Sequence, residues 1–256
     1  MKPIYTTIPV MLCQYALVHG KVNHLKLYIY FKQISSGYVS SNPNQLDAWA
    51  TDIGKSKRWV QTALKWLIKN KWITINNKRQ EFRVSGYREL CYKLDLLPHS
   101  SVIFEDDDYD SFKNFCCAVV FIYYLKLKIR TDKKNQSVSN LVDPIIKSWD
   151  FYFNGFHSMP ISYLAKILGV SNSTANNIKQ SALKTKLVMR KRNIPFLLNM
   201  FGKKIGVEHL QGLKKSCPEI SGRLRTNGKY IRIVDSDMFM ALISTKRKRY
   251  KFNEKK

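Results

Sequence analysis

The sequence has far fewer acidic residues than basic residues. Lysine and arginine number 44 and aspartate and glutamate only 18, so the net charge at neutral pH is +26. This balance predicts a polyanionic partner such as nucleic acid, although anionic lipid, a ribosome or a virion interior would satisfy the charge equally well. The acids are also unevenly spread, because five of them fall within six positions: Glu105, Asp106, Asp107, Asp108 and Asp110.

Cysteine is scarce and scattered. The five cysteines form no C-x-x-C motif and lie at no metal-binding spacing to the five histidines. A set of this kind predicts free, buried thiols in a reducing compartment. We therefore expect no structural zinc site and no other metal site.

Long hydrophobic runs are missing. The longest, FCCAVVFIYYL from Phe115 to Leu125, has eleven residues, whereas a membrane-spanning helix needs about 20. The first residues lack a signal-peptide cleavage pattern. The sequence therefore predicts a cytoplasmic protein with no membrane partner.

Signatures of catalysis are also absent. The chain has no G-x-x-x-x-G-K-[ST] phosphate-binding loop and no His-hydrophobic-His pair that would hold the metal of a nickase. Consecutive carboxylates at 105–110 are the right ligand type for Mg²⁺, but a linker does not fix them in a converging geometry. We expect no enzymatic activity and no cofactor; a metal nuclease that uses the acidic run is the rival hypothesis.

What the sequence does contain is an internal repeat. The segments LDAWATDIGKSKRWVQTALKWLIKNKWI (Leu46–Ile73) and ISYLAKILGVSNSTANNIKQSALKTKLV (Ile161–Val188) lie 115 residues apart. Superposed, Gly54 matches Gly169 and Ser56 matches Ser171. Each segment predicts a short helix that ends at glycine, a tight turn, and a second helix capped by serine. This is a helix-turn-helix, whose second helix can enter the DNA major groove.

The second helix of the first motif has a buried face and a basic face. Trp59, Val60, Ala63, Leu64 and Leu67 recur at helical spacing and predict the buried face. The opposite face and its cap supply the candidate DNA-binding residues Ser56, Lys57, Arg58, Gln61, Thr62 and Lys65. A basic hairpin tip after the helix adds Lys78 and Arg79, which would contact the backbone or the minor groove. For each of these, an ordinary solvated surface is the alternative.

The second motif has a different chemistry. Its candidate DNA-binding residues are mostly amides and hydroxyls: Ser171, Asn172, Ser173, Asn176, Asn177 and Gln180. Asparagine and glutamine can read adenine bidentately, so this face favours A·T pairs. Arg190, Lys191 and Arg192 follow on a predicted wing strand. Lys179 stands where an apolar residue usually packs, which leaves a thin core of Ala175, Ile178 and Ala182; pairing of subunits is therefore the alternative role for this unit.

The surrounding pattern predicts a mainly α fold with small β-hairpin wings, which belongs to the α+β class. It also predicts two tandem winged-helix domains followed by a basic C-terminal extension. We place the first winged-helix domain at 1–100, an acidic linker at 101–110, the second winged-helix domain at 111–205 and the extension at 206–256. The predicted helices outside the two motifs span 23–34, 112–130, 144–153, 207–214 and 235–244, with a polar loop at 131–140. The predicted strands are 72–75, 81–87, 187–192 with a partner before 200, and 230–234. The tail, with Lys246, Arg247, Lys248 and Arg249, adds phosphate affinity without sequence information.

The two repeated segments resemble the winged helix-turn-helix superfamily. Their tandem arrangement on a basic chain of this length is similar to that of replication initiator proteins of theta-replicating plasmids and phages. The resemblance implies duplex DNA with iterated sites as the partner and either half as a dimerisation surface. The preference for lysine (32) over arginine (12) is typical of an A·T-rich genome, as in a phage or mobile element.

The sequence-level hypothesis is a sequence-specific double-stranded DNA-binding protein, encoded by a prokaryote or a virus, that acts as a replication initiator. Two alternatives remain open at this point. One is a transcription regulator. The other is a structural or packaged phage protein that coats nucleic acid through charge alone.

Overall fold

The computed structural model describes residues 6–97, 100–104, 109–138, 155–192, 194, 196–199, 201–234 and 236–243. Within them the chain is mixed α+β, with small antiparallel sheets. The acidic run at 105–108, the helix predicted at 144–153 and the basic residues at 246–249 lie outside the described residues. No helix in the described ranges is long and apolar enough to cross a membrane.

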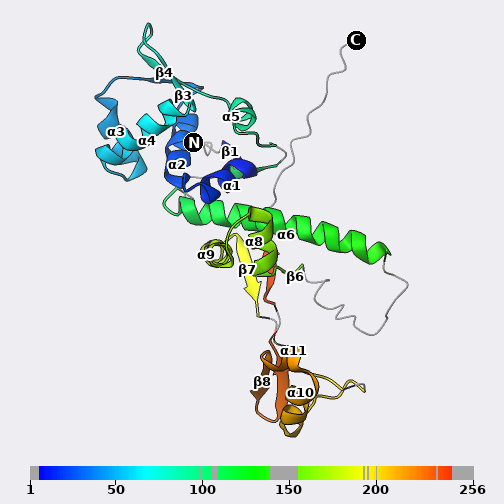
Figure 1. Cartoon of the computed structure of the whole chain (residues 1–256). Helices are drawn as coiled ribbons and strands as arrows, with labels where there is room; N and C mark the ends of the chain where they lie inside the picture. Colours follow the sequence, from blue (N-terminus) through cyan, green and yellow to red (C-terminus); the bar gives the residue numbers. More distant parts are fainter. Residues whose placement is uncertain are drawn as a thin grey trace, which may run out of the picture.

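The N-terminal unit is a group of helices beside two small sheets (Figure 1). Its elements are β1 (Thr6–Pro9), α1 (Val10–Val18), α2 (Val22–Ile34), β2 (Tyr38–Ser40), α3 (Gln45–Ile53), α4 (Lys57–Lys69), β3 (Ile73–Asn76), β4 (Glu81–Val84), α5 (Tyr87–Lys93) and β5 (Ser101–Phe104). One sheet has the order β2-β4-β3, and β1 pairs with β5 in the other. The helices predicted at 23–34 and 45–70 and the hairpin after them are confirmed; α5 was not predicted.

Helix α2 is the centre of this unit. A continuous stretch from Leu25 to Phe31 is buried, which is the pattern of a helix surrounded by other elements on all sides. Tyr28 contacts Trp72 edge-on at 5.4 Å between ring centroids, and its hydroxyl donates to the Ser85 carbonyl oxygen at 2.7 Å. Ile34, at the helix end, is half exposed.

Strand β5 lies within the segment that the sequence predicts as an acidic linker. It pairs antiparallel with β1, and the register places Thr7 opposite Ile103 and Ile8 opposite Val102. Val102 and Phe104 are buried in the core. Residues 101–104 are therefore part of a sheet. The linker prediction is wrong for them because three of these four residues are apolar, and the side chains of two of them are buried in the core.

The second unit follows the same order of helices. Its elements are α6 (Phe112–Val138), β6 (His157–Ser158), α8 (Ile161–Leu168), α9 (Asn172–Leu183), β7 (Val188–Lys191) and β10 (Met238–Ala241). Helix α6 continues through 131–138, where a polar loop was predicted. The prediction failed because lysine and glutamine have good helix propensity and are therefore compatible with a helix as well as with a loop.

The partner of β7 comes from far along the chain. The sheet order is β6-β10-β7, with Met238 opposite Lys191 and Ala241 opposite Val188. The prediction of a helix at 235–244 is wrong, as is the prediction that β7 pairs with the segment before 200. Met238 and Phe239 are buried, so the segment is held as a strand by its place in the core.

A small inserted module, residues 194–234, lies between β7 and β10. It contains the 3₁₀ turn η2 (Val207–His209), α10 (Leu210–Ser216), α11 (Pro218–Ser221), β8 (Leu224–Asn227) and β9 (Tyr230–Ile233). The predictions of a helix over 207–214 and a strand over 230–234 are confirmed. Leu224 and Ile231 form a separate small core. The module lies at the far end of β7 and β10, away from α6 (Figure 1).

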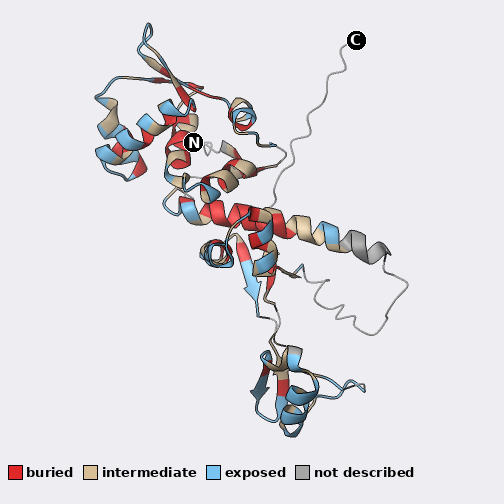
Figure 2. Ribbon diagram, viewed as in Figure 1, coloured by how far each residue is buried: buried red, intermediate tan, exposed pale blue. Residues whose placement is uncertain are grey.

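The N-terminal and second units share one hydrophobic core. Helix α6 packs against α1 on one side and α9 on the other, and its buried residues belong to the same cluster as those of α2 and α4 (Figure 2). The Tyr124 hydroxyl donates to Gln14 Oε1 at 2.7 Å across the two units. All five cysteines are free thiols as predicted, but only Cys13, Cys91, Cys116 and Cys117 are buried, whereas Cys217 is half-buried. The shared core fixes the relative positions of the two repeated motifs.

Candidate nucleic-acid interface

Both repeated motifs have the predicted local geometry. Gly54 and Gly169 end their helices in the left-handed conformation, with φ values of 65° and 64°. Only glycine adopts this conformation without strain, which explains its position in both repeats. The Ser56 hydroxyl accepts from the Trp59 backbone N–H at 3.3 Å, and the Ser171 hydroxyl accepts from that of Thr174 at 3.1 Å. Both serines are therefore helix N-caps, and α4 and α9 begin at equivalent positions of the two repeats.

Helix α4 is strongly two-faced. Val60, Ala63, Leu64 and Leu67 are buried as predicted, whereas Trp59 is only partly buried against the core. Arg58, Gln61, Thr62 and Lys65 are all exposed on the other face. The Thr62 hydroxyl donates to the Arg58 carbonyl oxygen at 2.8 Å and retains its acceptor capacity. The structure thus brings four of the predicted residues together on one open surface.

Lys57 differs from its neighbours because it has an acidic partner. Its ammonium lies 2.8 Å from Asp47 Oδ2 on α3. Both side chains are about half exposed or more, so the pair contributes no more than roughly 0.2–1 kcal/mol. Lys57 thus also helps to hold α3 against α4, a role that the sequence pattern did not reveal.

The hairpin of the first unit ends in a basic tip. Asn76 pairs with Glu81, which leaves residues 77–80 as an exposed connection that includes Lys78 and Arg79. The Asn76 side-chain oxygen accepts from the Arg79 backbone N–H at 3.4 Å and so shapes the turn. Arg83, farther down β4, forms an ion pair with Glu89 instead of joining this tip.

Helix α9 presents the amide-rich face that the sequence predicts. Asn172, Ser173, Asn177 and Gln180 are exposed, and Asn176 is half-buried. Ala175 and Ala182 are fully buried against α6. Lys179, which occupies a position where an apolar residue usually packs, is half-buried. Its ammonium lies 5.9 Å from the ring centroid of Phe239 on β10. Its apolar stem covers the core while its charge remains near the surface.

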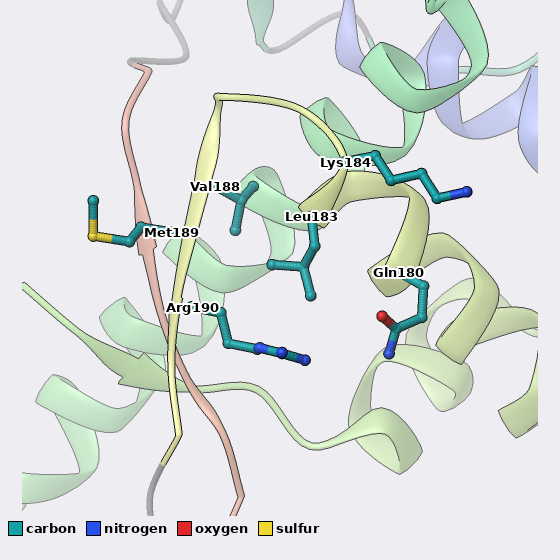
Figure 3. Close-up of a pocket in the computed structure, with 6 residues that line it drawn as sticks. All are labelled: Gln180, Leu183, Lys184, Val188, Met189 and Arg190. Atoms are coloured by element: carbon teal, nitrogen blue, oxygen red, sulfur yellow. The ribbon is translucent and has the colours of Figure 1, made fainter.

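An open pocket of about 440 Å³ separates α9 from β7. Gln180 and Lys184 line it from the helix, and Val188 and Arg190 point into it from the strand, whereas Met189 points away (Figure 3). Arg190 also lies 3.8 Å from Asp237 Oδ2. Lys191 and Arg192 are exposed at the end of the strand. Leu183 and Val188 supply an apolar wall, and the Lys184 side chain extends away from the strand, so Arg190 and Gln180 are the polar side chains at this hollow (Figure 3).

Sequence reasoning missed the basic surface on the inserted module. Arg225 and Arg232 are directly opposite each other on β8 and β9, with Asn227 opposite Tyr230. The signal was available, because the Asn-Gly pair at 227–228 sits between two alternating segments and is a strong hairpin indicator. The prediction covered only the second strand of this hairpin.

Three groups packed against the core of the N-terminal unit have shifted pKa values. Burial raises the pKa of the Cys91 thiol to about 11 and raises the pKa of Tyr28 well above its usual value. Burial and the nearby Lys21 ammonium lower the pKa of His24. Among the described residues, no group of three or more His, Cys, Asp or Glu side chains is placed to hold a metal ion.

Comparison of the chain with protein-family models, with curated proteins and with solved structures finds no match.

Proposed function

We propose that this protein is a non-enzymatic, sequence-specific binder of duplex DNA with two winged-helix units. In each unit the second helix of the repeated motif, α4 or α9, occupies a major groove. The antiparallel strands after that helix form the wing, whose cations contact phosphates. The observation that carries this proposal is the repeated geometry of a left-handed glycine, a capping serine and an exposed polar helix face.

The distribution of charge supports the same partner. Arg58 and Lys65 on α4 and Lys78 and Arg79 at the hairpin tip are exposed, and the described structure shows no ion pair for any of them. Unpaired surface cations repel one another in the free protein, and phosphates would neutralise them while releasing counterions. The binding constant should therefore fall steeply with salt.

The shared core supports binding to repeated sites. Because α6 packs against both α1 and α9, the two motifs have a fixed spacing rather than a flexible one. A rigid pair of reading helices selects DNA in which two short sequences recur at one separation. On this basis we propose that the protein is a replication initiator that binds repeats at an origin of a plasmid, phage or other mobile element.

Selection of bound sequences from a random duplex pool tests the proposal. The expected result is an enriched sequence with two conserved blocks separated by roughly one helical turn, about 10 base pairs. Enrichment of a single block, with copies of that block beside promoters in the encoding genome, would favour transcription regulation. Uniform binding without enrichment, together with a steep salt dependence, would contradict sequence-specific reading and favour a coating protein.

The non-enzymatic part of the proposal has its own test. Purified protein is incubated with supercoiled and linear DNA in the presence of Mg²⁺ or Mn²⁺. We expect no cleavage. Cleavage that is abolished by replacing Asp106, Asp107 and Asp108 with alanine would contradict the proposal and support a metal nuclease.

A further inference from the structure

We infer that the inserted module is an extension of the second wing and that its β8–β9 ribbon binds the phosphate backbone of duplex DNA beyond the site read by α9. The inference rests on the proposed function in one respect, which is that the duplex lies against α9. It adds a binding surface that is separate from both repeated motifs.

The position of the module is the first argument. In the first unit, four residues, 77–80, connect the paired ends of β3 and β4. In the second unit, 46 residues, 192–237, connect the paired ends of β7 and β10. The module therefore occupies the place of a wing tip, the part of a wing that lies closest to DNA. In the view of Figure 1, α9 lies to the left of β7, and β8 lies on the left side of the module.

The ribbon has one buried face and one polar face. Leu224 and Ile231 point to the core of the module, where both are buried. The pairs Arg225–Arg232 and Asn227–Tyr230 alternate with them and therefore share the other face. Like charges at directly opposite positions of two strands are unfavourable in the free protein, and an anion bound at this face would reduce that repulsion.

Aromatic rings hold the cations of this face in place. The Lys204 ammonium lies 4.3 Å from the Phe196 ring centroid and 5.4 Å from that of Tyr230. The Arg232 guanidinium carbon lies 4.0 Å from the Phe196 centroid. Such contacts order long side chains without neutralising them. In the described structure no carboxylate pairs with Lys204, Arg225 or Arg232, and the ribbon face keeps its charge.

The overall charge of the module is strongly positive. Between 194 and 234 there are eight basic residues and two acidic ones. The rings on the ribbon face contact one another and the cations, with Phe196 edge-on to Tyr230 at 6.0 Å between centroids. Lys204 and Arg232 already lie over the Phe196 ring, so, although Tyr230 is 40% exposed, the two rings do not form an open platform on which successive bases could stack. Phosphates of a duplex suit this surface better than the bases of a single strand.

The test compares two double variants of the full-length chain, each with two positive charges removed from the module. Arg225→Gln with Arg232→Gln alters the ribbon face. The matched control, Lys214→Gln with Lys215→Gln, alters two exposed lysines of α10. Binding to duplex is measured at several salt concentrations, and hydroxyl-radical footprinting maps the protected backbone.

The ribbon variant should lower the steepness of log K against log salt by about 1.8, which is 0.9 for each lost phosphate contact. It should also lose protection at one edge of the footprint while the selected sequence is unchanged. The control should do neither. Equal effects of the two variants would overturn the inference, since general charge rather than the ribbon would then be responsible.

Two further measurements separate the loss of a phosphate contact from a disturbed hairpin and from single-strand binding. Because Arg225 donates to the Gly222 and Leu224 carbonyl oxygens, its loss could disturb the hairpin. A second pair is Lys204→Gln, at the lysine beside Tyr230, with Lys229→Gln, at an exposed lysine in the turn between β8 and β9. This pair leaves those hydrogen bonds intact and should give the same change in salt dependence. Weakened binding to a single-stranded oligonucleotide with unchanged duplex binding would overturn the inference. A wild-type chain that protects no defined site would overturn the proposed function, while the salt slopes on random duplex would still decide the inference.

Discussion

The ammonium of Lys179 on α9 lies 5.9 Å from the ring centroid of Phe239 on β10, 60 residues later in the chain. Phe239 is fully buried and contacts Phe121 of α6 edge-on at 5.0 Å. One phenylalanine of β10 therefore packs against the long helix α6 and lies beneath a lysine of the candidate recognition helix. The small residues Ala175 and Ala182 allow α9 to approach α6 closely, and β10 supplies the volume that α9 lacks.

Replacing Phe239 with alanine should therefore destabilise the second unit strongly. The cavity and the lost burial together cost about 3–5 kcal/mol for a buried phenylalanine. Chemical denaturation followed by circular dichroism measures the loss. Phe201→Ala is the matched control, because Phe201 is 77% exposed and its truncation should change the stability little. Equal stability of the two variants would show that β10 is not part of the core.

Arg58→Glu should abolish specific binding to the selected duplex. Arg58 is exposed on α4, and the reversed charge would repel the phosphates on both sides of the groove. Electrophoretic mobility shift and fluorescence anisotropy measure the effect. Arg130→Glu, at an exposed arginine on α6, makes the same change in net charge away from the motifs. If both variants bind with the wild-type sequence preference, α4 is not a reading helix.

Alanine at Asn177 or Gln180 should relax the sequence preference of the second block without changing the salt dependence. Each bidentate amide contact to adenine discriminates by about 1–3 kcal/mol, and neither side chain carries a charge. Repeating the sequence selection with each variant gives the result. A selected sequence identical to that of the wild type would instead support a dimerisation role for α9, which sedimentation velocity would detect.

The two capping serines should contribute similarly to stability. Ser56→Ala and Ser171→Ala each remove an acceptor for a helix N–H, which costs about 1 kcal/mol. Both should also weaken DNA binding because the first turn of α4 or α9 would fray. Ser41→Ala, outside the two motifs, is a comparison without a helix cap. A loss of binding with full stability would indicate that the serines contact DNA directly.

Stability should fall as the pH drops below the ordinary histidine range. Burial and Lys21 lower the pKa of His24 in the folded state from 6.5, so the unfolded chain binds a proton first. The stabilising contribution is complete above pH 6.5 and is lost as the pH falls through the lowered value. Urea unfolding at pH 7.5 and 5.5 measures this, and His24→Phe, which keeps a ring beside Trp66, should reduce the difference. If His24→Phe leaves the stability difference between pH 7.5 and pH 5.5 unchanged, titratable groups other than His24 cause that difference.

The local structure of the motifs could be predicted from the sequence because the signals are short-range. Gly54, Ser56, Gly169 and Ser171 act within a few residues of themselves, and the structure confirms each of them. The exposed faces of α4 and α9 follow from helical spacing in the same way. The DNA-binding role of those faces remains a prediction.

The long-range pairings could not be predicted in this way. Strand β10 is stabilised by contact of Phe239 with Phe121 of α6 and by pairing with β7, and β5 is stabilised by pairing with β1 at the other end of the unit. In both cases the local sequence is compatible with another structure, and tertiary packing decides. The Lys57–Asp47 ion pair could not be predicted for the same reason, since the two side chains come together only when α3 packs against α4.

Hydroxyl-radical footprinting of the wild-type protein on its selected duplex tests the central claim most directly. The account predicts two protected segments about one helical turn apart for the wild type, and loss of both segments for Arg58→Glu, because that variant no longer binds the selected duplex specifically. A single protected segment that is unaffected by Arg58→Glu, or uniform protection along the whole duplex, would contradict it.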